Sequence, residues 1–354
     1  MKIKRLTLTS ILSFCFLFIQ CSFATTIDKI VVFGDSLSDN GNLYALTQKA
    51  SKVIPFMPII PKNPPYYAGR FSNGLAWVED LAIAMNVPLL DYAYGGSWAE
   101  PFHDSGLIVP FSLSSQVDMY MVSAITDYDI GKHLFVIWTG SNDYLNGRDN
   151  PDYATTNVVS NIQDQIDWLV YYGAKNFLLL GVPDLTVVPG IIAKGPKVVE
   201  NAALLVKYHN KKLSKLVKNS ATEYPGVNFV YGDIATAMDD IIANPEEYRL
   251  KNVISSCYTG PYYLGNLDLT NDRGVEAAKQ AKIDLTKSTS LKMVYLNGLG
   301  VGGQVCSNPD EYLFWDQIHP TRVTHQIVAM NAAIVLYENG ITGPNSIKPT
   351  ALKN

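Results

Sequence analysis

Charge and cysteine are both scarce in this sequence. Of its 354 residues only 17% are charged, 47% are hydrophobic, and four are cysteine. This many apolar residues can bury a sizeable core, and the composition is not that of a disordered protein. The length predicts one to two domains. Basic residues form no arm or cluster, which argues against binding to nucleic acid and against electrostatic docking on anionic lipid. Any contact with lipid should therefore be apolar.

Long hydrophobic runs are also missing. The N-terminal run, Ile11–Ile19, is shorter than the ~20 residues that a membrane-spanning helix needs. Three basic residues precede this run within the first five positions, and Ser22-Phe23-Ala24 follows it with small residues where a signal peptidase would cleave. We therefore expect residues 1–24 to be a signal peptide, with the mature, secreted chain beginning near Thr25.

Removal of that segment would change the balance of charge and of cysteine. It would leave 25 basic against 32 acidic residues, a net charge of −7, and it would remove Cys15 and Cys21. The two cysteines that stay, Cys257 and Cys306, are most simply a disulfide in an exported protein, and they are too few for a structural zinc site. Lipidation at Cys21 is an alternative for the N-terminus, but Gln20 is a bulky neighbour for that processing.

Short apolar runs alternate with helical patterns along the rest of the chain. Strands are expected at Ile30–Phe33, Leu89–Tyr94, Leu134–Trp138, Phe177–Leu180 and Val227–Tyr231. Helices are expected at Leu75–Met85, Asn157–Tyr171 and Val198–Lys218. This alternation predicts an α/β fold in which helices cover both faces of a parallel sheet. We expect one domain over residues 25–345, with an insertion at 257–306 between the two cysteines, and a C-terminal tail over 346–354.

The first polar turn, in "VVFGDSLSDNGN" (Val31–Asn42), follows a predicted strand at the edge where parallel sheets bind ligands. A calcium-binding EF-hand loop is a poor explanation, because Leu37 and Asn40 occupy positions that need a ligand oxygen and a glycine. A phosphate-binding P-loop would need Gly-Lys-Ser/Thr, which this turn lacks. An ordinary polar turn with helix-capping residues remains the alternative for this stretch taken alone.

Three more polar segments come later in the chain. They are "YAYGGSWAE" (92–100), "WTGSNDY" (138–144) and "DQIHPTRVTH" (316–325). Together with "FGDSLSDNGN" they resemble, in residues and in order, the four sequence blocks of the GDSL, or SGNH, hydrolases. The resemblance spans nearly the whole mature chain and implies a flavodoxin-like fold. With the secretion signal and the C-terminal pair of cysteines, the chain is similar to the bacterial secreted lysophospholipase A and glycerophospholipid:cholesterol acyltransferase branch.

The resemblance implies roles for individual residues. Ser36 would be the nucleophile, His319 its general base, and Asp316 the carboxylate that orients the histidine. The chemistry agrees, because an imidazole must remove the serine proton, and a carboxylate three residues before the histidine can share one side of a helical turn. The oxyanion hole would consist of the backbone N–H groups of Ser36 and Gly96 and the side-chain amide of Asn142. No cofactor and no metal are implied.

Other residues offer weaker alternatives. Ser97 lies in a Gly-x-Ser-x-Ala pattern that approximates a nucleophile elbow, but Pro101 and Gly106 break the helix that should follow. The spacing Gly298-x-Gly300-x-x-Gly303 fits a dinucleotide site only if a helix follows it, and none is expected there. The remaining histidines, expected to be structural or solvated, are His103, His133, His209 and His325.

We therefore expect a secreted serine esterase that releases fatty acid from phospholipids or lysophospholipids through an acyl-enzyme on Ser36, with a sterol as a candidate acyl acceptor. The alternatives are a carbohydrate or short-chain acetyl esterase of the same fold, and a non-catalytic binding module. In the lipid acyltransferases that the chain resembles, a protease cuts a cystine-bounded loop. The resemblance thus implies an activating protease that cuts between Leu267 and Leu291.

Apolar and aromatic residues in irregular segments favour a lipid substrate and transient contact with a membrane surface. The same residues would also be explained by packing of loops onto the core, which leaves lipid specificity dependent on the resemblance. These residues are Phe56, Met57, Ile59, Ile60, Tyr66, Tyr67, Trp98, Phe102, Leu107, Ile108, Val109 and Phe111.

Overall fold

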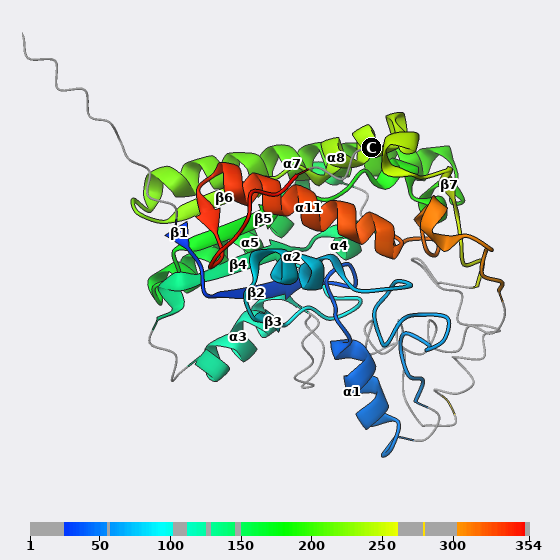
Figure 1. Cartoon of the computed structure of the whole chain (residues 1–354), viewed down its shortest axis with the longest axis horizontal. Coiled ribbons are helices and arrows are strands. Elements are labelled where there is room, and N and C mark those ends of the chain that lie inside the picture. The colour runs from blue at the N-terminus through cyan, green and yellow to red at the C-terminus, as the bar shows by residue number, and fades with distance from the viewer. Residues whose placement is uncertain are drawn as a thin grey trace, which may run out of the picture.

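The centre of the molecule is a sheet of five parallel strands in the order β3-β2-β4-β5-β6 (Figure 1). The structure, a computed structural model, describes residues 25–54, 57–101, 112–124, 129–145, 150–260, 279 and 303–350. The strands are β2 (Lys29–Gly34), β3 (Leu89–Asp91), β4 (His133–Trp138), β5 (Asn176–Leu180) and β6 (Asn228–Gly232). Numbered by their appearance within the sheet, this order is 2-1-3-4-5, as in flavodoxin. The predicted α/β fold is confirmed.

The strands alternate their side chains between two apolar layers. In β2, Ile30 and Val32 belong to one layer and Val31 and Phe33 to the other, and all four are fully buried. Helices α2 (Trp77–Met85) and α11 (Arg322–Glu338) pack together over the first layer. Helices α3 (Leu113–Ser123), α5 (Pro151–Tyr171) and α7 (Pro196–Glu223) cover the second. Both faces of the sheet are thus buried, as the continuous apolar strands predict.

Shorter elements surround this framework. The helices are α1 (Asn42–Ala50), α4 (Ser141–Leu145), α6 (Pro189–Ile192) and α8 (Ile234–Ala243). The 3-10 turns are η2 (Ile130–Lys132), η3 (Leu185–Val187), η4 (Pro245–Tyr248) and η5 (Pro309–Glu311). Two parallel pairs complete the strands, β1 (Thr25–Thr26) with β9 (Ile341–Thr342) and β7 (Asn252–Ser256) with β8 (Tyr312–Phe314). None of the described helices is long and apolar enough to cross a bilayer.

The strand expected over Leu89–Tyr94 is assigned only as far as Asp91, but the segment after it stays beside β2. The backbone N–H groups of Tyr92 and Tyr94 donate to the carbonyl oxygens of Val32 and Gly34 at 2.9 and 3.2 Å. Side-chain groups add to these contacts: the amide of Asn42 donates to the carbonyl oxygens of Asp91 and Ala93, at 2.9 and 3.0 Å, and the Asp91 carboxylate accepts the N–H of Ala93 at 2.8 Å.

The helix expected over Val198–Lys218 runs over Pro196–Glu223. Leu205 is buried, but Leu204 is exposed and His209 takes a place in the core.

Cys257 and Cys306 form the predicted disulfide, with their Cα atoms 4.9 Å apart. The bond closes the segment that follows β7 and joins it to the segment that leads into β8. Three predicted features lie outside the described residues. They are the signal peptide, the protease site between Leu267 and Leu291, and the Gly298-x-Gly300-x-x-Gly303 spacing up to its last glycine.

Candidate active site

Ser36 lies in a tight turn at the carboxyl end of β2. The backbone N–H groups of Ser38 and Asp39 both donate to the carbonyl oxygen of Asp35, at 3.0 Å each. Gly34 lies two residues before Ser36. A Cβ at this position would meet the carbonyl oxygen of Trp138 on the neighbouring strand at 2.7 Å, so the turn needs a glycine there. The turn lies between β2 and β4, where the strand order reverses and where ligands bind in such sheets.

The structure brings Ser36, His319 and Asp316 together in one chain of hydrogen bonds. Nε2 of His319 lies 2.8 Å from the Ser36 hydroxyl oxygen, and Nδ1 lies 2.8 and 3.0 Å from the two carboxylate oxygens of Asp316. His319 and Asp316 are buried, whereas Ser36 keeps 8% of its surface exposed. The ring of Phe71 packs against the imidazole with a centroid distance of 5.0 Å. This is the geometry in which an imidazole can take a serine proton.

Asp316 and His319 do not share a helical turn, contrary to expectation. They lie in an irregular segment, and α11 begins only at Arg322. Instead, Oδ1 of Asp316 accepts the backbone N–H groups of Ile318 and His319 at 2.8 and 2.7 Å, so the carboxylate itself closes the turn. Burial raises the pKa of Asp316, but the neighbouring His319 and the hydrogen bonds that the carboxylate accepts lower it more, to below its usual value.

Tyr66 is a site residue that sequence reasoning did not find. Its hydroxyl donates to Oδ2 of Asp316 at 2.6 Å, and its side chain is buried. In the sequence Tyr66 is one of several aromatic residues in a proline-rich loop, and no local pattern relates it to Asp316. Its ring contacts those of Tyr258 and Trp315 edge-on.

Gly96 and Asn142, predicted for the oxyanion hole, lie on adjoining segments, a loop and the short helix α4. Gly96 has a φ of +79°, a conformation that favours glycine. Asn142, in α4, donates from its side-chain amide to the carbonyl oxygen of Ser97 at 2.9 Å. Asn142 and Ser36 line the same pocket. The amide therefore holds the Gly96 loop and faces the space beside Ser36.

Ser97, the rival nucleophile, has a structural place. It is fully buried, and its hydroxyl accepts a hydrogen bond from the Gln116 side chain at 2.8 Å. The same side-chain amide also accepts a hydrogen bond from the backbone N–H of Gly34 and donates one to the Gly34 carbonyl oxygen, each at 2.8 Å. Gln116, which the sequence did not single out, thus links the loop of Gly96 to the strand that carries Ser36.

Two buried carboxyl groups tie the first turn to its surroundings. Asp39 accepts backbone N–H groups from Asn42 and Gly95 at 2.6 and 2.8 Å, among others, and so joins the first motif to the second. Burial raises the pKa of Asp39 to about 6, although four such hydrogen bonds oppose the shift. Burial also raises the pKa of Asp35 to about 6, against the opposing effects of the Leu37 N–H and the nearby His319.

The other described histidines are structural. His133, His209 and His325 are all buried, and each uses Nδ1 in a hydrogen bond to a neighbour. Burial lowers the pKa of His209 and of His325 to about 3, so both rings are neutral at ordinary pH. His103 lies outside the described residues.

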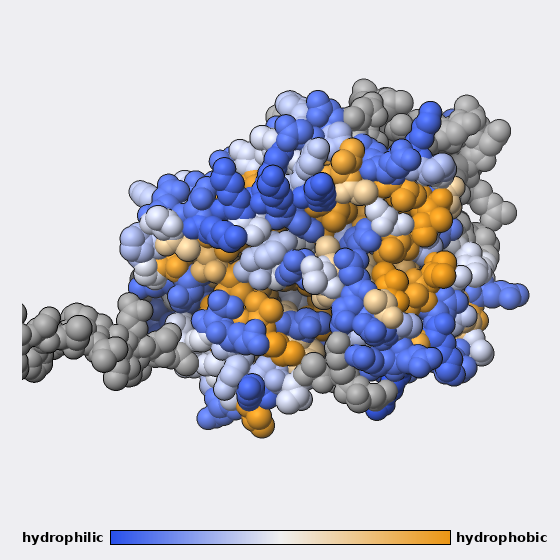
Figure 2. Space-filling view, turned by 90° about the horizontal axis from the view of Figure 1, so that it is seen from above, coloured by the Kyte–Doolittle hydropathy of each residue, from blue (hydrophilic) through white to orange (hydrophobic). Residues whose placement is uncertain are grey.

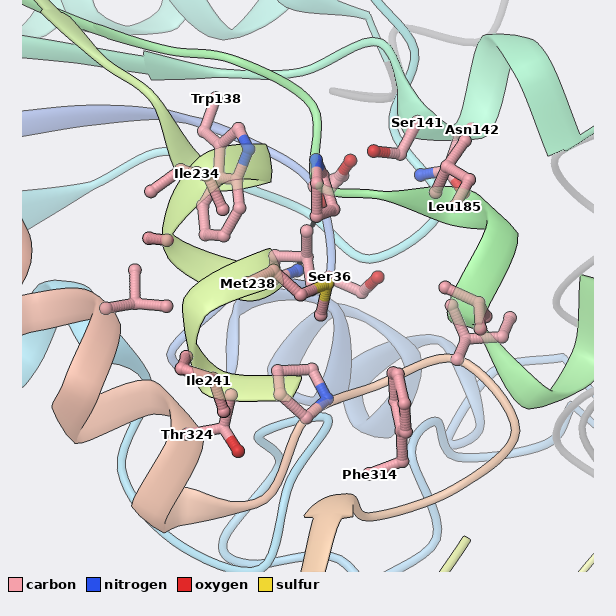
Figure 3. Close-up of a pocket in the computed structure, with 18 of the residues that line it drawn as sticks. Ser36, Trp138, Ser141, Asn142, Leu185, Ile234, Met238, Ile241, Phe314 and Thr324 are labelled. Carbon is pink, nitrogen blue, oxygen red and sulfur yellow. Dashed lines mark hydrogen bonds between the residues drawn. The ribbon is translucent and has the colours of Figure 1, made fainter. Parts of the chain in front are cut away.

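An apolar pocket opens beside Ser36, beyond the carboxyl ends of β2, β4, β5 and β6 (Figure 3). It encloses about 750 Å³ between the protein atoms, counting the open space at its mouth. Most of the lining is aliphatic or aromatic, with Ile234, Met238 and Ile241 from α8 forming one wall. The sequence signal for this wall is the spacing of those three residues, which places them on one face of a helix. Of the loop aromatics expected to favour lipid, the described ones, Tyr66, Tyr67 and Trp98, are not part of this lining, and Phe56, Phe102 and Phe111 lie outside the described residues.

Within the described ranges, no three His, Cys, Asp or Glu side chains are placed to hold a metal ion. The geometry of Ser36 and His319 places a serine hydroxyl beside an imidazole, at the mouth of an apolar pocket.

Comparison with known proteins bears on this geometry. A phosphatidylcholine-sterol acyltransferase from Aeromonas hydrophila is 30% identical over 312 residues, which cover 86% of this chain and 89% of that protein. A thermolabile hemolysin from Vibrio parahaemolyticus is 27% identical, covering 86% of this chain and 62% of that one. Among solved structures, a family two carbohydrate esterase from Clostridium thermocellum is 12% identical with a TM-score of 0.40, covering 88% of this chain and 65% of that chain.

The family model described as GDSL-like Lipase/Acylhydrolase matches residues 30–332. That range begins in β2, just before Ser36, and ends within α11, after His319. The chain therefore belongs to the GDSL-like lipase/acylhydrolase family and is an ester hydrolase or acyltransferase of that family.

Proposed function

We propose that this protein is a serine esterase that releases fatty acid from phospholipids or lysophospholipids. The observation that carries the proposal is the 2.8 Å contact between Ser36 and Nε2 of His319 at the mouth of an apolar pocket. A nucleophile at the entrance of such a pocket can meet the ester carbonyl of a lipid while the acyl chain lies among aliphatic side chains.

The reaction would proceed in two halves. Ser36 Oγ attacks the ester carbonyl while its proton passes to Nε2 of His319, and Asp316 stabilises the resulting imidazolium through Nδ1–H. The tetrahedral oxyanion is held by the backbone N–H groups of Ser36 and Gly96 and by the amide of Asn142. A primary amide has two N–H groups, so one can hold the Ser97 carbonyl while the other meets the oxyanion.

Collapse of this intermediate breaks the ester C–O bond. The imidazolium gives its proton to the departing alcohol oxygen, and the acyl group stays on Ser36. Water then attacks the acyl-enzyme with His319 again as base, which releases fatty acid. A second alcohol in place of water would give acyl transfer, and the similarity to a sterol acyltransferase makes a sterol the acceptor to test.

We also propose that the protein is secreted and meets its substrate at a membrane surface. The Cys257–Cys306 disulfide supports an oxidising compartment. An activating protease that cuts within the cystine-bounded segment remains part of the proposal.

The test is a product assay with four substrates, a lysophospholipid, a diacyl phospholipid, a short-chain ester and an acetylated glycan, each with and without cholesterol. We expect fatty acid from the phospholipids. Sterol ester in the presence of cholesterol would establish acyl transfer, and release of acetate alone would contradict the lipid assignment.

Two variants identify the nucleophile in the same assay. Ser36→Ala should abolish turnover and leave the fold intact, because a turn hydroxyl carries little core packing. Ser97→Ala should retain turnover, since the Ser97 hydroxyl accepts a hydrogen bond from Gln116. Full activity of Ser36→Ala with an inactive Ser97→Ala would reverse the assignment, and the absence of any product from the wild type would indicate a non-catalytic binding module.

A further inference from the structure

The short helix α6 lies beside the turn that carries Asp316 and His319. The backbone N–H of Gly190 donates to the carbonyl oxygen of Gln317 at 2.8 Å, which fixes the helix to that turn. Val188, at the start of α6, and Ile318, next to Gln317, both line the pocket beside Ser36. The outer surface of α6 is therefore continuous with the mouth of the pocket.

Apolar side chains are exposed on this surface. Ile192, the last residue of α6, is 45% exposed, and Val198, in the first turn of α7, is 36% exposed. Strand β7 contacts α6 and adds Ile254, which is 70% exposed. In Figure 2 apolar residues gather over the right-hand end of the molecule, the end at which Figure 1 shows β7 and the start of α11. These three residues lie on elements that contact one another, α6 with α7 and α6 with β7, and exposed apolar residues gathered in this way mark interaction sites.

Two lysines lie between the apolar residues. The segment "IIAKGPKVV" (191–199) places Lys194 and Lys197 between Ile192 and Val198, and both lysines are exposed. In the described part of the chain neither lysine has an ion-pair partner. Positive charge thus accompanies apolar side chains at this corner, which differs from the expectation that any contact with lipid would be apolar alone. The two lysines are a local feature, because acidic residues outnumber basic residues in the whole sequence, 32 to 28.

We propose that this corner, which consists of Ile192, Lys194, Lys197, Val198 and Ile254, docks the enzyme on a phospholipid bilayer that contains anionic lipid. Apolar side chains would enter the boundary between headgroups and acyl chains while the lysines contact headgroup phosphates. The lipid ester would then pass from the bilayer directly to the pocket beside α6. The inference rests on the proposed function, because a lipid substrate is the reason for a membrane at this edge.

A second copy of the chain is a less suitable occupant for the corner. A twofold interface places the same patch of each subunit against itself. Here Lys194 and Lys197 of one copy would face the same lysines of the other, and the exposed Glu200, one turn after Lys197 in α7, would offset only part of this repulsion. An anionic bilayer complements both the apolar residues and the lysines.

The test measures binding to vesicles separately from turnover. The full chain with Ser36→Ala, which leaves the vesicles intact, is sedimented with vesicles of phosphatidylcholine and phosphatidylglycerol. In this Ser36→Ala background, a further Ile254→Glu or Ile192→Glu substitution should weaken binding to the vesicles about tenfold, because a carboxylate would stand where an apolar side chain enters the bilayer. Ile83→Glu is the matched control, since Ile83 is 69% exposed on α2, which covers the opposite face of the sheet from α7. It should leave partitioning unchanged.

The contribution of the two lysines to vesicle binding is tested by removing their charge. Lys194→Gln and Lys197→Gln should each weaken binding to the anionic vesicles about fivefold and leave binding to pure phosphatidylcholine vesicles nearly unchanged. Lys218→Gln, an exposed lysine at the far end of α7, is the control and should change neither.

In an otherwise wild-type chain, Ile254→Glu should retain hydrolysis of a short soluble ester and lose hydrolysis of vesicle lipid. Equal effects of Ile254→Glu and Ile83→Glu on partitioning, or no effect of either, would overturn the docking surface. A change in self-association on Ile254→Glu with vesicle binding unaltered would overturn it in favour of a second copy. A failure of the proposed function gives a different result. The wild type would then release no fatty acid, while its binding to vesicles would still depend on Ile254.

Discussion

The hydroxyl of Tyr66 lies 2.6 Å from Oδ2 of Asp316, although 250 residues separate the two in sequence. The Tyr66 ring also packs edge-on against Tyr258, at a centroid distance of 5.8 Å, and Tyr258 follows the half-cystine Cys257 directly. The carboxylate that holds His319 is therefore connected, through the side chains of Tyr66 and Tyr258, to the disulfide that closes the C-terminal insertion.

Tyr66→Phe removes the hydrogen bond and keeps the ring. We expect kcat to fall about tenfold with KM nearly unchanged, because a donor to a buried charged group is lost and the carboxylate is held less firmly. The acid limb of the pH–rate profile should move to higher pH, since a carboxylate with one donor fewer stabilises the imidazolium more strongly. Steady-state kinetics between pH 5 and 9 on a soluble ester measure both effects. Tyr67→Phe, at an exposed neighbour, is the control, and an unchanged profile for Tyr66→Phe would contradict a positioning role.

Asn142→Ala tests the third oxyanion donor. We expect kcat to fall about 10²–10³-fold with only a modest change in KM, by analogy with the loss of one donor elsewhere. The substitution also removes the hydrogen bond from the Asn142 side chain to the Ser97 carbonyl oxygen, which holds the Gly96 loop. Thermal unfolding is therefore measured alongside the kinetics. A rise in KM alone would mean that Asn142 binds substrate and that the hole is built from other groups.

Met238→Trp tests whether the apolar pocket takes the acyl chain. The larger side chain should fill space beside Ile234 and Ile241, and kcat/KM for a long-chain lysophospholipid should fall at least about tenfold. Hydrolysis of a butyrate ester should change little, because a short chain does not reach this wall. Met238→Leu, which conserves volume, is the control. Equal losses on both substrates would place the acyl chain elsewhere.

His325→Asn tests a pH effect on stability. Burial lowers the pKa of His325 to about 3, so below pH ~6.5 the unfolded chain binds a proton that the folded chain does not. The free energy of unfolding should therefore fall with decreasing pH, by ~1.4 kcal/mol per pH unit from this group alone. Asparagine keeps an acceptor for the backbone N–H of Trp77 and does not titrate.

Urea unfolding of both proteins between pH 7 and 4 isolates this contribution. Asp35 and Asp39, whose raised pKa values give the opposite slope, are present in both and cancel in the difference. Identical pH dependence in wild type and variant would show that His325 does not contribute.

Limited proteolysis tests regulation of the site. We expect preferential cleavage between Leu267 and Leu291, giving two fragments that separate only after reduction, because Cys257 and Cys306 join them. Activity on a long-chain lipid should rise more than activity on a short soluble ester. In the double variant Cys257→Ser/Cys306→Ser the fragments should separate without reductant. Cleavage at other positions, or cleavage here without gain on either substrate, would leave the segment with a purely structural role.

Local patterns were sufficient to predict the sheet, whereas Ser36 and His319 were predicted from the resemblance of their segments to the GDSL hydrolase blocks. Apolar runs with β-branched residues predict strands, and a polar turn after each strand predicts an edge where such turns meet. Tyr66 and Gln116 could not be predicted in the same way, because each acts on a partner far away in sequence. Nothing near Gln116 indicates that its amide would bond Gly34, just as the loop around Tyr66 gives no sign of Asp316.

Ser36 and His319 come from opposite ends of the described chain, and this has a consequence for synthesis. Ribosomes make the N-terminal part first, so strands β2 to β6 and the serine turn exist while the last helix is still missing. The imidazole arrives only with the segment just before α11, and β9 joins β1 later still. On the proposed mechanism, a nascent or prematurely terminated chain therefore carries the serine hydroxyl without the imidazole that would activate it, and esterase activity would be withheld until the segment before α11 has been made.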